Sequence, residues 1–116
     1  MSTIAKNKLS GSTDGLPVLV VATATVGTTI HTAVAGTSNW DEVWIYANNS
    51  HSADVLLTLE WGGVAAKDLI QFTVPLKSGL NLIAPGLILQ NGMLVTAFAG
   101  TANVIGLSGF VNSITV

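Results

Sequence analysis

The chain contains no arginine and no cysteine, and only 9% of its 116 residues are charged. Soluble domains ordinarily carry about 25% charged residues, which keep a free surface solvated. Four lysines and a net charge of −2 cannot build a strong phosphate-binding surface, so we expect no nucleic-acid partner. The absence of cysteine excludes disulfides and thiolate metal sites.

A transmembrane-length hydrophobic run is also missing. The apolar segment Leu16–Ala24 is far shorter than the roughly 18 to 20 residues that a transmembrane helix needs. It begins late for a signal peptide and continues into threonine-rich sequence without a convincing cleavage site. We therefore expect a chain made in the cytoplasm without Sec export and with no membrane partner.

Apolar residues, by contrast, are abundant: 49% of the chain is hydrophobic and the mean hydropathy is +0.62. The surface must therefore be built from threonine, serine, asparagine, glycine and alanine, or be covered by other protein. Both alternatives favour a structural or assembly protein over an enzyme with a polar site. A chain of this length forms one domain and can fold without metal or disulfide links.

The first fifteen residues differ from the rest, because they are polar and rich in glycine, serine and threonine. We interpret residues 1–15 as an extended N-terminal arm and residues 16–116 as a β-sandwich domain. The arm holds half of the lysines, and Ile4, Lys6, Lys8 and Leu9 are its candidate partner-binding residues. Such a segment can become ordered by adding a strand to a partner. The alternative is a disordered terminus.

Short runs rich in valine, isoleucine and threonine, separated by turn residues, predict an all-β fold. We expect a single antiparallel β-sandwich or a jelly-roll-like barrel. Asn91–Gly92 favours a type I′ turn and predicts a hairpin between the strands that flank it. The predicted strands are Pro17–Thr25, Thr28–Val34, Glu42–Asn48, Asp54–Trp61, Leu69–Val74, Gly79–Ala84, Leu87–Gln90, Met93–Ala99 and Asn103–Ile114.

Two kinds of strand can be distinguished by their patterns. Alternation predicts that residues 55, 57, 59 and 61 face the core, as do residues 70, 72 and 74. Trp61 is therefore predicted to belong to the core. Val18–Val21, Val43–Tyr46 and Met93–Ala99 are instead apolar on both faces, which indicates that their outer faces meet something else, such as a neighbouring subunit. We therefore expect an obligate homo-oligomer.

Residues that could carry chemistry do not form a convincing set. His31 and His51 lie on separate segments, and His51 with Asp54 and Glu60 is too sparse for a metal site. The side chains of the adjacent Asp41 and Glu42 diverge, so they make a poor acid/base pair. Ser50, His51 and Asp54 cluster in one turn, whereas a catalytic triad converges from separate elements. We predict no enzyme activity, catalytic residue, metal or cofactor.

Trp44 and Tyr46 share one face of a predicted strand. We interpret these aromatic side chains as core or subunit-interface packing. An exposed aromatic pair could instead stack on sugar rings, as in a carbohydrate-binding module.

Several strings of residues are distinctive when taken together: Leu9–Gly15, Gly27–Ala33, Asp41–Asn48, Glu60–Gly63, Pro85–Gly92 and Gly109–Asn112. In these strings the chain resembles a family of small virion proteins encoded by tailed bacteriophages. The resemblance implies a capsid decoration, or cement, protein that sits on the outside of the head and clamps neighbouring capsomers. Its implied partner is the major capsid protein, and its implied location is the virion exterior.

The sequence therefore leads us to expect a homotrimeric decoration protein, since a trimer suits the local threefold positions of an icosahedral shell. Two alternatives remain open. One is a carbohydrate- or host-surface-binding module, such as the base of a head fibre. The other is a structural component of the tail or neck.

Overall fold

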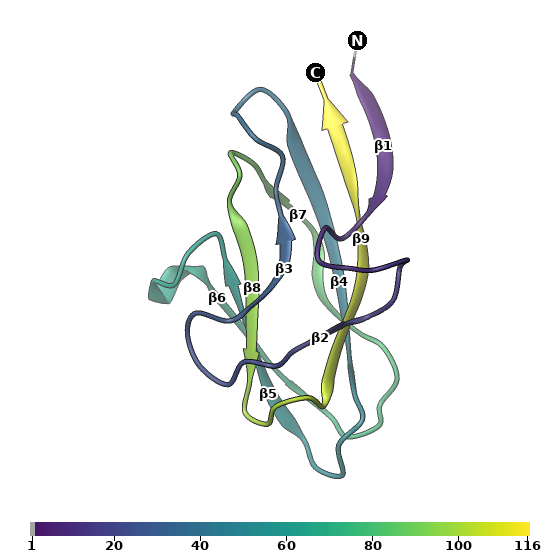
Figure 1. Cartoon of the computed structure of the whole chain (residues 1–116), viewed down its shortest axis with the longest axis vertical. Coiled ribbons are helices and arrows are strands. Elements are labelled where there is room, and N and C mark those ends of the chain that lie inside the picture. The colour runs from purple at the N-terminus through teal and green to yellow at the C-terminus, as the bar shows by residue number, and fades with distance from the viewer. Residues whose placement is uncertain (1) are drawn as a thin grey trace.

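The computed structural model describes residues 2–116, and the regular structure within them is almost entirely β (Figure 1). This confirms the predicted all-β class. A single short 3-10 helix, η1 (Ala66–Asp68), accompanies the strands in this described range. The strands are β1 (Thr3–Lys8), β2 (Val18–Leu19), β3 (Thr28–Thr32), β4 (Trp40–Asn49), β5 (Val55–Trp61), β6 (Leu69–Val74), β7 (Asn81–Leu89), β8 (Leu94–Ala99) and β9 (Ile105–Thr115).

The strands form two antiparallel sheets that pack face to face. Sheet A has the order β1-β9-β4-β7, with β2 also paired to β9, and sheet B has the order β3-β8-β5-β6. Strands β2 to β5 pair with β9 to β6 in reverse order, as if one long hairpin had been rolled up. This is the connection pattern of a jelly roll, and it confirms the predicted β-sandwich or jelly-roll-like fold.

The core lies between the sheets because alternate residues of the central strands point inward. On β4, Val43, Ile45 and Ala47 are fully buried, while every second residue between them is only half-buried. From the opposite sheet, Leu57 and Leu59 of β5 complete the same cluster. The alternation predicted for β5 is therefore confirmed.

Trp61 ends β5 on the core side and packs, partly buried, against the core cluster, as predicted. Phe72 lies opposite Leu57 in the sheet register and so shares its inward face, yet its side chain is exposed. The reason is position: β6 is an edge strand of sheet B, and the outermost strand of a sandwich is the least covered.

The turn at Asn91–Gly92 is confirmed, but the hairpin predicted around it is wrong. Both residues have positive φ, 62° for Asn91 and 67° for Gly92. However, β7 belongs to sheet A and β8 to sheet B, so the turn carries the chain from one sheet to the other. Turn residues determine where the chain reverses, whereas strand pairing depends on which faces become buried.

Strand β7 is continuous where two strands were predicted. The expected break at Pro85–Gly86 is a bulged region in which the register with β4 shifts. Proline is tolerated there because β7 is an edge strand and need not donate a hydrogen bond outward. Gly86 has a φ of 78°, and a Cβ atom there would lie 2.9 Å from the Trp44 ring. Glycine therefore allows the indole to lie across β7.

The predicted strand Pro17–Thr25 is mostly a loop, with only Val18–Leu19 in β2. The loop segment that follows folds over the outer side of sheet B and covers the carboxylate of Glu60. That carboxylate accepts hydrogen bonds from Thr25 Oγ1 at 2.7 Å, the Gly27 amide at 2.7 Å and Thr96 Oγ1 at 2.6 Å. Glu60 points away from the core, as the alternation predicts, but is only 1% exposed.

The separate N-terminal arm expected for residues 1–15 is not confirmed, and Met1 lies outside the described residues. Strand β1 pairs with residues 110–115 of β9, beside β2 on the same edge. Leu9 is 1% exposed and belongs to the core. The Ser10 amide then donates to Nδ1 of His31 at 3.0 Å, which fastens this segment to β3.

Helical structure in residues 2–116 includes no segment long and apolar enough to span a membrane.

Candidate functional site

The outer side of sheet A carries a row of aromatic and apolar side chains that we call the aromatic face. Residues directly opposite each other in the sheet register share one face, which groups side chains from three neighbouring strands. The members are Ile4, Lys6 and Lys8 of β1; Phe110, Asn112 and Ile114 of β9; and Trp40, Glu42, Trp44 and Tyr46 of β4.

Strand β4 determines this arrangement. Its inward residues build the core, so the residues between them must point outward. Those outward residues are half-buried rather than fully exposed, because neighbouring strands supply large side chains beside them. Each β4 residue is matched by one on β9: Trp40 by Ile114, Glu42 by Asn112 and Trp44 by Phe110.

The centre of the aromatic face is a stacked pair. The rings of Trp44 and Phe110 lie 6.0 Å apart between centroids and are inclined by 11°. Lys6 Nζ lies 4.2 Å from the centroid of the Phe110 ring, within the range of a cation–π contact. Because β1 supplies this lysine, the N-terminal strand and the aromatic pair form one continuous surface.

Polar groups hold the stacked pair in place. Trp44 Nε1 donates to Glu42 Oε1 at 2.7 Å, and Asn112 Nδ2 donates to the same oxygen at 3.1 Å. These two hydrogen bonds lower the pKa of Glu42 below its ordinary value, against a smaller opposing effect of desolvation. Glu42 is therefore ionised at neutral pH, and the indole has a fixed orientation.

The structure brings together most of the residues predicted as contacts. Ile4, Lys6 and Lys8, which the sequence assigned to an arm, lie on the same face as Trp44 and Tyr46. Leu9 does not, because its side chain packs in the core. The prediction that Leu9 anchors a partner is corrected by this burial.

Sequence reasoning missed the contributions of Phe110, Asn112 and Glu42 to this surface. The sequence of β9 alone predicts, by alternation, that Phe110, Asn112 and Ile114 point to the same side of the sheet. However, nothing local indicates that β9 lies between β1 and β4, and the aromatic face depends on that pairing.

A second polar cluster, around His31, is buried. His31 Nε2 lies 2.8 Å from Asp41 Oδ2, and Nδ1 accepts the Ser10 amide. A ring nitrogen that accepts an N–H carries no proton, so His31 is the neutral tautomer that donates from Nε2. Both side chains are almost fully enclosed, and the cluster ties the N-terminal segment to β3 and β4. Asp41, weighed above beside Glu42, is the hydrogen-bond partner of His31.

The residues weighed for catalysis in the turn after β4 are engaged separately. The His51 amide donates to Asn49 Oδ1, the Ser50 hydroxyl donates to the Val104 carbonyl, and Asp54 Oδ1 accepts the Leu76 amide. Across residues 2–116, no three histidine, aspartate or glutamate side chains gather as metal ligands would. What the aromatic face offers is a broad, pre-ordered surface for contact.

No protein-family model, curated protein or solved structure matches this chain.

Proposed function

We propose that this chain is a structural protein that decorates the outside of a bacteriophage head, with its aromatic face docked against the major capsid protein. The observation that carries the proposal is the ordered Trp44–Phe110 pair, with Lys6 over the Phe110 ring and the indole held by Glu42. Tryptophan, tyrosine and phenylalanine are enriched at the centres of protein interfaces, where they supply much of the binding energy. The proposed role needs no catalytic group or cofactor.

The arrangement of charge supports protein docking. Glu42 stays ionised, and its carboxylate accepts hydrogen bonds from Trp44 and Asn112, while Lys6 and Lys8 lie on the edge strand β1. An apolar centre with charge at its margin is the usual anatomy of an interface. The lysines would then steer the encounter, and the aromatic rings would provide the affinity.

Two further considerations support a phage head as the assembly to which this chain binds. The chain resembles small virion proteins of tailed phages in the residue strings quoted above, several of which supply parts of β4, β7 and β9. Jelly rolls are also frequent in viral capsid proteins and in lectins, although this is an analogy at the level of the fold. A decoration protein presented in many copies, as a homotrimer, would gain avidity from its repeated contacts.

The proposal is tested by mixing the purified protein with phage heads that lack it and measuring occupancy by density-gradient sedimentation. Truncating an interface hot spot costs about 2 kcal/mol or more, so Trp44→Ala should weaken binding at least roughly 30-fold. Phe72→Ala removes an exposed aromatic ring from sheet B and is the matched control, expected to bind like wild type. Equal occupancy for all three proteins would contradict docking through the aromatic face.

A second candidate function is glycan binding, because Trp44 and Phe110 lie nearly parallel with Glu42 and Asn112 beside them. Sugars stack on such rings and hydrogen-bond to polar neighbours. Protein docking is favoured, since Trp44 Nε1 and Asn112 Nδ2 already donate to Glu42. Oligosaccharide titration followed by tryptophan fluorescence separates the two functions: saturable quenching that Trp44→Ala abolishes would establish glycan binding.

A further inference from the structure

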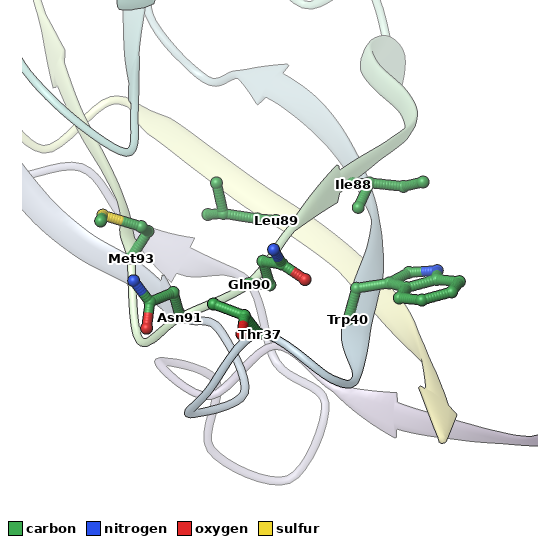
Figure 2. A pocket seen from close by; sticks show the side chains of 7 residues that line it. All are labelled: Thr37, Trp40, Ile88, Leu89, Gln90, Asn91 and Met93. Atoms are coloured by element: carbon green, nitrogen blue, oxygen red, sulfur yellow. The ribbon is translucent and has the colours of Figure 1, made fainter. Parts of the chain in front are cut away.

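The end of the sandwich around the turn from β7 to β8 carries a second apolar surface, which we call the tip patch. It contains two open depressions, of about 630 and 260 Å³, and Met93 lines both of them. Figure 2 shows Met93 and Trp40 at opposite margins of the larger one, with Leu89 and Gln90 between them. The lining residues are Thr37, Trp40, Ile88, Leu89, Gln90, Asn91 and Met93 for the larger depression, and Val26, Gly62, Gly63, Val64, Gly92, Met93, Leu94 and Thr96 for the smaller.

The tip patch is held rigidly by backbone hydrogen bonds. The amides of Asn91 and Gly92 donate to the carbonyls of Gly36 and Val34, each at 2.9 Å. The Met93 carbonyl accepts the Ala33 amide at 2.9 Å, so the turn is fastened to the connection between β3 and β4. A surface ordered in advance loses little conformational entropy when it binds.

Large apolar side chains are exposed over the whole patch. Val26, Val64, Ile88, Met93 and Leu94 are between 41% and 67% exposed. Exposed large apolar side chains that gather in one region usually mark a site of protein contact.

The tip patch has no charged residue among the residues that line its depressions. Asp68 lies beside Gly63 at the edge of the smaller depression, where its carboxylate pairs with Lys67 at 2.7 Å. The polar side chains of the lining, Thr37, Gln90, Asn91 and Thr96, are all neutral. The depressions therefore have a neutral lining, and the Lys67–Asp68 pair at the margin carries no net charge.

We propose that the tip patch binds a second copy of this chain, with Met93 of one copy entering a depression of its neighbour. Near a rotation axis each residue meets its own counterpart, so any charge there would face a like charge. The neutral lining of the tip depressions avoids that repulsion. The aromatic face, with Lys6, Lys8 and Glu42, is better suited to a different partner. Methionine fits an irregular depression well because its side chain is unbranched and flexible.

This inference rests on the proposed function, since it names the surface through which the decorating copies associate with one another. It assigns the two apolar surfaces to different partners: the tip patch to self-association and the aromatic face to the capsid. Trp40 belongs to both surfaces, so the two assignments are tested separately at Met93 and Trp44, each of which belongs to one surface only.

The first test is sedimentation velocity of the full-length protein at micromolar concentration. Wild type should sediment as an oligomer, and Met93→Asp should weaken self-association by roughly tenfold or more, because it places like charges together at the contact. Leu80→Asp is the matched control: Leu80 is 63% exposed and precedes β7 at the end of that strand remote from Met93. It should assemble like wild type. A monomeric wild type, or a Met93→Asp protein that assembles normally, overturns the proposal.

A second test does not depend on destabilising the contact. The chain has no cysteine, so Met93→Cys introduces a unique thiol. Mild oxidation should convert that protein to covalent dimers within preformed oligomers, whereas Leu80→Cys should remain uncross-linked. Equal cross-linking of the two variants would contradict the tip contact. If the Met93→Asp protein is monomeric but still binds phage heads, the assignment of the aromatic face to the capsid is not contradicted. If the Trp44→Ala protein is oligomeric and still decorates heads, only the assignment of the aromatic face is contradicted.

Discussion

At the residue scale, the buried polar side chains all have hydrogen-bond partners within residues 2–116. Glu60 is the clearest case. Burial by itself raises the pKa of its carboxyl, but hydrogen bonds from Thr96, Thr25 and Gly27 outweigh that effect and the pKa is lowered. A carboxyl whose folded pKa lies below its unfolded pKa stabilises the fold above the ordinary value of 4.5. That contribution is lost as the pH falls through the folded pKa.

We therefore expect Glu60→Gln to lower the free energy of unfolding at pH 7 by about 1.5–3 kcal/mol, the range for hydrogen bonds to a charged group. The variant should also lose less of its remaining stability than wild type as the pH falls below 4.5. Thermal melts between pH 7 and pH 3 measure both effects. Asp14→Asn, which changes an exposed carboxylate, should follow wild type. If the melting temperature of Glu60→Gln falls with pH as steeply as that of wild type, the Glu60 carboxylate does not contribute to stability in this way.

Trp61 allows a second test at the residue scale. Its ring packs against the core cluster but remains partly exposed. We expect Trp61→Ala to cost roughly 3 kcal/mol, the lower end of the range for truncating a buried tryptophan. Chemical denaturation measures this loss, with Phe72→Ala as the exposed aromatic control. Unchanged stability would show that the indole does not contribute to the core.

At the element scale, β1 differs from every other strand because all six of its residues are exposed. It pairs with β9 yet covers no part of the core, which begins at Leu9. Deletion of residues 2–8 should therefore leave a folded protein with a small loss of stability. The same deletion removes Lys6 and Ile4 from the aromatic face, so occupancy on phage heads should fall.

Deletion of residues 2–15 provides the contrast, since it also removes Leu9 and the Ser10 amide that donates to His31. The loss of a fully buried leucine costs about 2–5 kcal/mol, so this longer truncation should melt well below the shorter one. Circular dichroism of the two truncations measures the difference. Similar melting temperatures would show that Leu9 does not hold the N-terminal segment to the body.

At the scale of the whole molecule, two apolar surfaces lie on a chain with only 9% charged residues. Association through the tip patch should therefore resist salt, because no charged residue lines its depressions and the Lys67–Asp68 pair at the margin lies within one chain. Sedimentation at 1 M sodium chloride should show the same oligomer as at low salt, and sulfate should strengthen it, since excluded salts favour apolar burial. Dissociation at high salt would point to an electrostatic contact instead.

Some features could be predicted from the sequence because they are local. Alternation of apolar residues identified the inward face of β5. The positive φ values of Asn91 and Gly92 follow from the tolerance of those two residue types for left-handed backbone. Each of these inferences depends only on residues near one another in the chain.

The remaining features were decided by tertiary structure, because they depend on which distant strands become neighbours. The turn at Asn91–Gly92 joins two sheets because β7 pairs with β4, and β8 pairs with β3 and β5. Glu60 is buried because a loop from more than thirty residues away folds over it. The aromatic face exists because β9 lies between β1 and β4, which brings Lys6, Phe110 and Trp44 together. Local propensity specifies strands and turns, whereas the partner of each strand is selected by the shared burial of a core.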